Sequence, residues 1–322
     1  MRIAVLDDYQ RRAREFADWD SLGPDSRVSF FHERIDPALL ADKLEAFDVL
    51  VLMRERTPFP RAVLERLPRL ALLVTTGMNN ASVDVAYLRE RGVVVSGTPF
   101  VLSDPSSGGL PIPVEVAWAL IFALFKRVTV EDPAVRDGRW QLDMPGALAG
   151  ATLGLAGLGF LGAAMVAPAK LFGMSVIAWS ENLSGDRAAE LDVQPVSKRE
   201  LLGRSDVLSI HLRMSERTRG LFAERELAQM KSTAVLVNTS RGPIVDESAL
   251  IEALAGGTIA AAGLDVFDEE PLPPRHPLLT LENAVLLPHF GYASEYAFRA
   301  MYAAAVEAIA AFLDHAPIRV LV

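Results

Sequence analysis

Three polar side chains, Arg241, Glu270 and His289, each lie just beyond an apolar run of the sequence, where a loop is expected. A planar guanidinium can bind a carboxylate, and an imidazolium can donate a proton to a carbonyl oxygen. A carboxylate beside the imidazole favours the protonated form. Together the three side chains are the set that the reduction of a 2-keto acid requires. Taken singly, Arg241 also fits a surface charge, Glu270 a solvated acidic loop and His289 a structural role.

A glycine-rich turn provides the second chemical signal. Gly157, Gly159 and Gly162 form the pattern G-x-G-x-x-G between an expected strand and a helix-like stretch. The first glycine permits a tight turn, the second lets a pyrophosphate approach the backbone, and the third lets the helix pack closely on the strand. The alternative is a glycine turn that binds nothing. The strand–turn–helix context favours a dinucleotide site formed by Gly157, Gly159, Phe160, Leu161 and Gly162.

The ribose of such a cofactor is expected at the end of the next strand, Ser175–Trp179, where an acidic residue is typical. Ser180 stands at that position, and Glu181 and Asn182 follow it. No arginine in this stretch pairs with a 2′-phosphate, and Glu181 would repel one. The sequence therefore favours NAD, although a pocket of Ser180 and Asn182 also accommodates NADP.

Apolar runs that predict strands alternate with helix-like stretches along the chain. The first series of expected strands comprises Arg2–Leu6, Val28–Phe31, Val49–Met53, Leu72–Thr75 and Val93–Ser96. The second comprises Thr152–Ala156, Ser175–Trp179, Val207–His211, Ala234–Asn238, Gly263–Val266 and Ala284–Leu287. Expected helices include Pro37–Ala46, Val114–Lys126 and Ser294–His315. The alternation predicts an α/β fold with two doubly wound domains, separated near the Gly-, Pro- and Ser-rich stretch Gly97–Pro113.

The composition restricts the functions that this fold can carry. The 322 residues have a formal charge of −9 and no basic block, which argues against nucleic-acid binding. The absence of cysteine excludes disulfides, cysteine-rich zinc sites and thiol catalysis, and no metal ion is expected. The N-terminal stretch does not resemble a signal peptide, and the apolar run Val116–Phe125 is shorter than the roughly 20 residues that span a bilayer. These features predict a cytoplasmic protein without membrane partners.

Four motifs, in this order, resemble those of the D-isomer-specific 2-hydroxyacid dehydrogenase family, and the resemblance covers essentially the whole chain. They are GLAGLGFLG, NTSRGPIVDE, GLDVFDEEPLP and LLPHFGYAS. The resemblance implies that Arg241, Glu270 and His289 are the catalytic residues of an NAD-dependent dehydrogenase for a small 2-keto acid and its D-2-hydroxy acid. It also implies four further cofactor residues: His211, Thr239, Asp265 and Gly291. Among these, Asp265 is expected to contact the nicotinamide carboxamide.

Two stretches near the N-terminus resemble substrate-binding segments of the same family. The resemblance of TTGMNNASVD to the carboxylate-binding loop implies that the backbone N–H groups of Gly77 and Met78 contact the substrate. The resemblance of LMRERT to an active-site strand end implies that Arg54 contacts a second carboxylate or a phosphate. A plain surface arginine is the alternative for Arg54.

The resemblance also implies a domain arrangement. A flavodoxin-like substrate domain, residues 1–97 and 289–322, is interrupted by a Rossmann domain, residues 98–288. A homodimer formed through residues 114–148 is expected by the same resemblance.

Some positions depart from the family pattern. Phe160 stands where many relatives have an arginine beside the pyrophosphate, so weaker cofactor binding is expected. Val114 replaces a common threonine and removes a hydroxyl near the cofactor. The Gly97–Pro113 loop looks longer than usual, and Ser180 leaves the choice between NAD and NADP open.

Two other functions are compatible with parts of this pattern. Some relatives sense NAD(H) as transcriptional corepressors without turnover, but a sensor needs no proton donor, so intact Arg241, Glu270 and His289 favour the enzyme. Formate dehydrogenases of this fold pair their histidine with glutamine, whereas this chain has Glu270. The sequence leaves open which 2-keto acid is used, because pocket shape decides side-chain discrimination.

Overall fold

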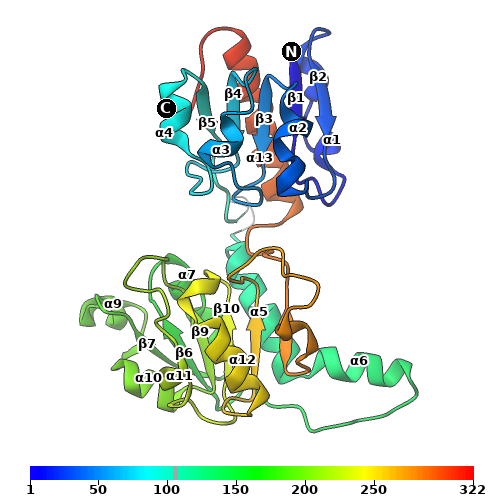
Figure 1. Cartoon of the computed structure of the whole chain (residues 1–322). Helices are drawn as coiled ribbons and strands as arrows, with labels where there is room; N and C mark the ends of the chain where they lie inside the picture. Colours follow the sequence, from blue (N-terminus) through cyan, green and yellow to red (C-terminus); the bar gives the residue numbers. More distant parts are fainter. Residues whose placement is uncertain (104–107) are drawn as a thin grey trace. The chain divides into compact units, whose positions relative to one another are not determined.

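The computed structural model describes residues 1–103 and 108–322. The chain forms two compact units (Figure 1). Unit 1 consists of Met1–Ser107 and Ser294–Val322, and unit 2 consists of Gly108–Ala293.

The boundaries expected after residues 97 and 288 lie earlier than the observed ones, so His289 belongs to unit 2 and not to the substrate domain. At the second boundary, two hydrogen bonds tie this segment to unit 2: the two residues after His289 donate their backbone N–H groups to Asp265. Residues 104–107 of the long loop expected at 97–113 lie outside the described residues.

Unit 1 is built on a five-stranded parallel sheet in the order β2-β1-β3-β4-β5, which is the flavodoxin-like order. Its strands are β1 (Arg2–Val5), β2 (Arg27–Phe30), β3 (Val49–Leu52), β4 (Leu72–Thr75) and β5 (Val94–Gly97). Its helices are α1 (Ala13–Phe16), η1 (Trp19–Leu22), η2 (Pro37–Leu39), α2 (Leu40–Leu44), α3 (Arg61–Leu64), α4 (Val85–Glu90) and α13 (Glu295–Leu313). Every residue of β3 and β4 is buried, as expected for strands covered on both faces.

The C-terminal segment completes unit 1. Ser294 caps α13 by accepting the N–H of Ala297 at 3.1 Å, and α13 packs against β4, β5 and α1. Within residues 1–103 and 108–322, α13 is the one helix long and apolar enough to cross a membrane. Its apolar side chains include Phe298 and Met301, which are buried in unit 1, so this face serves as core.

Unit 2 is built on a seven-stranded sheet in the order β12-β11-β10-β9-β6-β7-β8, and all of its strand pairs are parallel. Its strands are β6 (Thr152–Ala156), β7 (Ser175–Trp179), β8 (Gln194–Pro195), β9 (Val207–Ile210), β10 (Val235–Asn238), β11 (Ala261–Leu264) and β12 (Ala284–Leu286). Its helices are α5 (Ile112–Phe125), α6 (Val128–Arg136), α7 (Phe160–Ala164), α8 (Val166–Leu171), α9 (Gly185–Glu190), α10 (Lys198–Arg204), α11 (Glu224–Leu227), η3 (Gly242–Ile244), α12 (Glu247–Ala255) and η4 (Pro277–Thr280).

The strand order of unit 2 is that of a Rossmann fold with one additional strand, and it reverses direction between β6 and β9. The predicted fold class is therefore confirmed. The elements that the sequence did not indicate include one strand and one helix of unit 2. Strand β8 has only two residues, and α6 contains Pro133, which is unusual within a helix.

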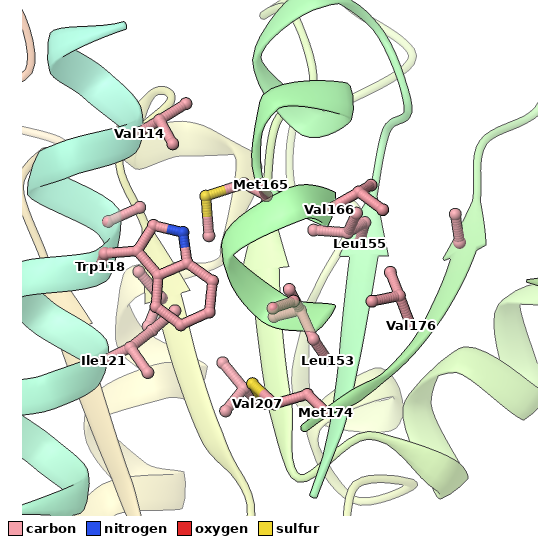
Figure 2. Packing of buried hydrophobic residues seen from close by; sticks show 14 of the residues in the cluster. Val114, Trp118, Ile121, Leu153, Leu155, Met165, Val166, Met174, Val176 and Val207 are labelled. Atoms are coloured by element: carbon pink, nitrogen blue, oxygen red, sulfur yellow. The ribbon is translucent and has the colours of Figure 1, made fainter. Parts of the chain in front are cut away.

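The core beneath the glycine-rich turn is formed by α5 and the first strands of unit 2. Figure 2 shows Val114, Trp118 and Ile121 facing Leu153 and Met165. Fully burying an aliphatic side chain stabilises a fold by about 1.5–3 kcal/mol. Val114, which stands where many relatives have a threonine, is fully buried in this core.

Close packing of α5 on the sheet requires a glycine in β11. A Cβ on Gly263 would lie 2.9 Å from Leu120 Cβ. This approach brings α5 against the strand that ends beside Asp265.

Candidate active site

The side chains predicted to do chemistry in unit 2 follow neighbouring parallel strands. His211 follows β9, Arg241 follows β10, and His289 follows β12. Glu270 lies in the loop after β11, and strand β11 pairs with both β10 and β12. The carboxyl ends of parallel strands form one edge of the sheet, where open α/β sheets bind ligands. The glycine-rich turn follows β6, which pairs with β9, and so lies on the same edge.

His289 and Glu270 form a direct pair. His289 Nδ1 lies 2.6 Å from Glu270 Oε2, and both side chains are about one-third exposed. The other oxygen, Glu270 Oε1, accepts the backbone N–H of Phe267 at 2.9 Å. An ionised carboxylate only accepts hydrogen bonds, so Nδ1 carries a proton and Nε2 remains for another partner.

Asp265 holds the loop that carries His289. It is fully buried, and its two oxygens accept the N–H groups of Phe290 and Gly291 at 2.6 and 2.7 Å. His289 itself has a left-handed backbone with φ of +55°. Burial raises the pKa of Asp265 to about 6, while the two backbone N–H groups act in the opposite direction. Sequence reasoning missed this anchoring role, and the expected contact with a nicotinamide carboxamide stays a prediction.

Arg241 is presented by a turn that Asn238 closes. Asn238 Nδ2 donates to the carbonyl oxygen of Arg241 at 2.9 Å, and Asn238 Oδ1 accepts the N–H of Ser240 at 3.0 Å. Gly242 lets this turn pack on the Glu270 loop, because a Cβ there would lie 2.1 Å from the carbonyl carbon of Phe267. The Arg241 side chain is exposed and donates only to the neighbouring carbonyl oxygen of Ser240, at 2.7 Å, in the described structure.

The three glycines of the turn have different neighbours. Gly157 has φ of +102°, and a Cβ on it would lie 2.6 Å from the carbonyl oxygen of His211. A Cβ on Gly162 would lie 2.1 Å from the carbonyl oxygen of Gly157. A Cβ on Gly159 would meet no described atom within 4 Å. Packing within the protein therefore accounts for Gly157 and Gly162, whereas the open side of Gly159 is the kind of surface that a pyrophosphate approaches.

The other predicted cofactor residues border this turn. Phe160 is the first residue of α7 and is 66% exposed, whereas Leu161 packs partly on the core. Burial lowers the pKa of His211 to about 4, so its imidazole is neutral at pH 7, and Nε2 lies 2.9 Å from Ser209 Oγ. Thr239 follows β10 directly and is buried.

The end of β7 differs from the sequence expectation in one respect. Ser180, Glu181 and Asn182 follow this strand as expected, but an arginine is also present. Arg217 Nη1, from the loop after β9, lies 3.5 Å from Glu181 Oε2, and both side chains are about 70% exposed. The stretch itself contains no arginine, as expected, and Arg217 reaches it from 36 residues away in the sequence.

The substrate-binding residues expected in unit 1 meet one another. Arg54 has φ of +54°, and its Nη1 donates to the carbonyl oxygen of Thr76 at 2.9 Å. A Cβ on Gly77 would lie 2.0 Å from Arg54 Nη1, so the guanidinium lies directly against this glycine. The Gly77 N–H, expected to bind substrate, donates to Thr98 Oγ1 at 3.0 Å and is already used.

Arg54 differs from an ordinary surface arginine. Its side chain is only 16% exposed, and its guanidinium carbon lies 4.6 Å from the ring centre of Phe100. Met78 is half exposed, and no acceptor for its N–H is found among residues 1–103 and 108–322. Over the same described ranges, no group of three or more His, Asp or Glu residues lies close enough together to hold a metal ion.

Comparison with known proteins agrees with this geometry. Residues 118–291 match the family model described as "D-isomer specific 2-hydroxyacid dehydrogenase, NAD binding domain". The chain is 39% identical over 283 residues to a glyoxylate reductase of Aeropyrum pernix, covering 85% of this chain and 82% of that protein. It is 34% identical over 309 residues to glyoxylate/hydroxypyruvate reductase B of Yersinia pestis, covering 94% of this chain and 89% of that protein.

Among solved structures, the fold is similar to that of a phosphoglycerate oxidoreductase from Vibrio cholerae. The TM-score is 0.90 at 33% sequence identity, and the match covers 98% of this chain and all of that one.

Proposed function

Because the chain belongs to the D-isomer-specific 2-hydroxyacid dehydrogenase family, and so is an oxidoreductase that interconverts 2-keto and 2-hydroxy acids with NAD(H) or NADP(H), we propose that Arg241, Glu270 and His289 are its catalytic residues. The observation that carries this assignment is the 2.6 Å contact between His289 Nδ1 and Glu270 Oε2 beside the Arg241 turn. The pairing leaves His289 Nε2 free of Glu270, at the edge of the sheet where ligands bind.

Each catalytic side chain has one task in this proposal. Arg241 binds the substrate carboxylate with its planar fork. Protonated His289 donates from Nε2 to the keto oxygen during reduction and takes the proton back during oxidation. Glu270 accepts the hydrogen bond from Nδ1–H throughout, which orients the ring, and its negative charge stabilises the imidazolium. When bound, the nicotinamide cofactor supplies the hydride for reduction.

The glycine-rich turn and its neighbours are proposed to hold the cofactor. The open face of Gly159 receives the pyrophosphate, and neutral His211 lines the site without adding charge. Leu161, Thr239, Asp265 and Gly291 complete the site. Phe160 provides no cation for the phosphates, so we expect weaker binding than an arginine would give.

The end of β7 is proposed to select NADH over NADPH. Glu181 accepts hydrogen bonds from ribose hydroxyls and repels a 2′-phosphate, with Ser180 and Asn182 beside it. Arg217 partly offsets this repulsion, because it lies 3.5 Å from Glu181.

The substrate is proposed to be a small 2-keto acid of the glyoxylate or hydroxypyruvate class, with the D-isomer as the hydroxy-acid product. The names of the relatives support this class. In unit 1, the Met78 N–H is proposed to bind substrate. Arg54 contacts Thr76 and Phe100, and its Nη2 lies 3.5 Å from Glu55 Oε2; we propose that it favours acids with a second anionic group, which would compete with Glu55 for the guanidinium.

We propose that the chain is cytoplasmic and forms a homodimer through residues 114–148. Figure 1 shows α6 extending away from the sheet of unit 2. The segment that follows α6 carries large exposed apolar side chains, among them Trp140 at 75% and Met144 at 85%. Exposed apolar patches mark interaction surfaces. Sedimentation equilibrium is expected to give twice the chain mass, and a monomer would contradict the proposal.

The direct test is a turnover assay with glyoxylate, hydroxypyruvate, pyruvate and a phosphorylated 2-keto acid, each with NADH and NADPH. We expect consumption of reduced cofactor with at least one acid, and oxidation of only the D-isomer of the product when it is chiral. Tight cofactor binding without turnover of any acid would instead support a nucleotide-sensing protein.

A further inference from the structure

The loop that carries Glu270 contains no helix or strand between the end of β11 and the start of η4. The position of Glu270 therefore depends on side-chain contacts rather than on regular hydrogen bonding. One carboxylate supplies two such contacts. Glu247, the first residue of α12, accepts the Asp268 N–H with Oε2 at 3.2 Å, and its Oε1 lies 3.0 Å from His276 Nε2. These two anchor points lie on either side of Glu270 in the sequence.

The His276 ring is held in one tautomer. The N–H of Leu278 donates to His276 Nδ1 at 3.4 Å, so Nδ1 accepts and Nε2 carries the proton that is donated to Glu247. The side chains of His276 and Glu247 are only 14% and 18% exposed. Four charged or titratable groups act on the neighbouring Asp268: Glu247 and Asp246 with negative charge, and Arg219 and His276 with positive charge.

The contact from Glu247 leads to the catalytic pair through adjacent backbone groups. Asp268 donates its N–H to Glu247, and the preceding residue, Phe267, donates its N–H to Glu270 Oε1 at 2.9 Å. A shift of Asp268 therefore displaces the N–H that orients Glu270. Glu270 in turn contacts His289 at 2.6 Å. Small displacements of reacting groups reduce rates strongly.

We propose that Glu247 and His276 are positioning residues that act through Glu270, an inference that rests on the proposed role of the Glu270–His289 pair. Neither residue touches substrate in this proposal. Their task is to hold the 267–276 loop at both ends so that the Glu270 carboxylate meets His289 Nδ1.

Glu247→Gln tests this directly. Glutamine keeps the size of the side chain but replaces one carboxylate oxygen with an NH2 group. Because Asp268 and His276 contact different oxygens of Glu247, in either orientation of the amide this NH2 group faces one of the two N–H donors and loses that hydrogen bond. We expect kcat for reduction to fall about tenfold, since misplacing a catalytic group carries a cost of this order or more. KM for NADH is expected to change less than about twofold, and the alkaline limit of reduction is expected to move to lower pH. Glu252→Gln on the same helix is the control, because Glu252 is exposed and its removal should change none of these values.

A double variant separates positioning from general stability. If Glu247 acts through Glu270, adding Glu247→Gln to Glu270→Gln should lower kcat by less than about twofold, because coupled residues are not additive. His276→Leu, which removes the donor to Glu247 Oε1, should show the same pattern if Glu247→Gln folds poorly.

Three results would overturn the proposal. In the first, the melting temperature of Glu247→Gln falls while kcat and the pH profile stay unchanged. This result would show that Glu247 has a purely structural role. In the second, the losses in the double variant multiply. In the third, Glu270→Gln alone leaves the pH profile unchanged, which removes the catalytic pair and the positioning role together. The first two leave the proposed function intact.

Discussion

His289 Nδ1 lies 2.6 Å from Glu270 Oε2, although 19 residues separate them in sequence. The two side chains come from the loops after β12 and β11, which are neighbouring parallel strands. Backbone N–H groups fix both partners, since Phe267 donates to Glu270 and the residues after His289 donate to Asp265. The pair is therefore held from both sides before substrate binds.

Replacing His289 should abolish most turnover while preserving cofactor binding. Asparagine is a better replacement than alanine, because it tolerates the left-handed backbone at φ of +55°. We expect kcat of His289→Asn to fall by about 100- to 10,000-fold, the usual range for a positioned proton donor. The Kd for NADH, measured by fluorescence titration, should change little. Wild-type turnover by the folded variant would exclude His289 as the acid.

The charge of Glu270 should determine the pH range of catalysis. Reduction needs His289 to carry a proton on Nε2, and a neighbouring negative charge stabilises the imidazolium, so Glu270→Gln should lose reduction activity at a lower pH than the wild type. Oxidation needs neutral His289 and should become possible at a correspondingly lower pH. The measurement is kcat against pH in both directions. Exposed Glu269→Gln is the control, and coincident profiles for Glu270→Gln and the wild type would falsify the pair.

Two glycines of the cofactor turn should respond differently to alanine. Gly159→Ala adds a methyl group with no described atom within 4 Å, so the melting temperature should be unchanged, whereas cofactor affinity should fall at least about tenfold. Gly162→Ala places its Cβ 2.1 Å from a backbone oxygen and should destabilise unit 2 itself. Melting curves with and without NADH distinguish the two. An unchanged Kd for Gly159→Ala would show that no pyrophosphate lies there.

Asp265 should make the stability depend on pH. Its folded-state pKa of about 6 lies above the ordinary value of 3.8, so the folded state holds this proton more tightly than the unfolded state does. Its contribution to the free energy of unfolding should therefore fall as pH rises from about 4 to about 6, by at most about 3 kcal/mol. Asp265→Asn cannot titrate and should lack this component. Denaturant unfolding of both proteins at several pH values measures it, and parallel pH dependences would contradict it.

Cofactor preference should depend on the Glu181–Arg217 pair. We expect the wild type to have the higher kcat/KM with NADH. An exposed ion pair contributes at most about 1 kcal/mol, so a 2′-phosphate could compete with Glu181 for Arg217. Glu181→Gln should therefore raise kcat/KM with NADPH about tenfold, and adding Arg217→Gln should remove the gain. A gain that persists in the double variant would exclude Arg217, and better use of NADPH by the wild type would overturn the NADH preference.

Several features of the fold and site followed from local sequence. The alternating apolar runs specified two parallel sheets, because strands covered on both faces must be apolar along their length. The loops after those strands supplied Arg241, Glu270 and His289, since the carboxyl ends of parallel strands share one edge. The spacing of Gly157, Gly159 and Gly162 between an expected strand and a helix-like stretch likewise indicated the turn.

Tertiary packing decided the partners that lie far apart in sequence. In the folded chain the Gly77 N–H donates a hydrogen bond to Thr98, and Arg217 lies beside Glu181. It also joined the loop before η4 and the loop after β12 to distant anchors, through His276 with Glu247 and through the backbone at Gly291 with Asp265. Hydrophobic periodicity records which face of an element is buried, but it holds no information on which polar groups meet once the elements pack. Those contacts depend on the register and approach of strands and loops, and they exist only in the folded chain.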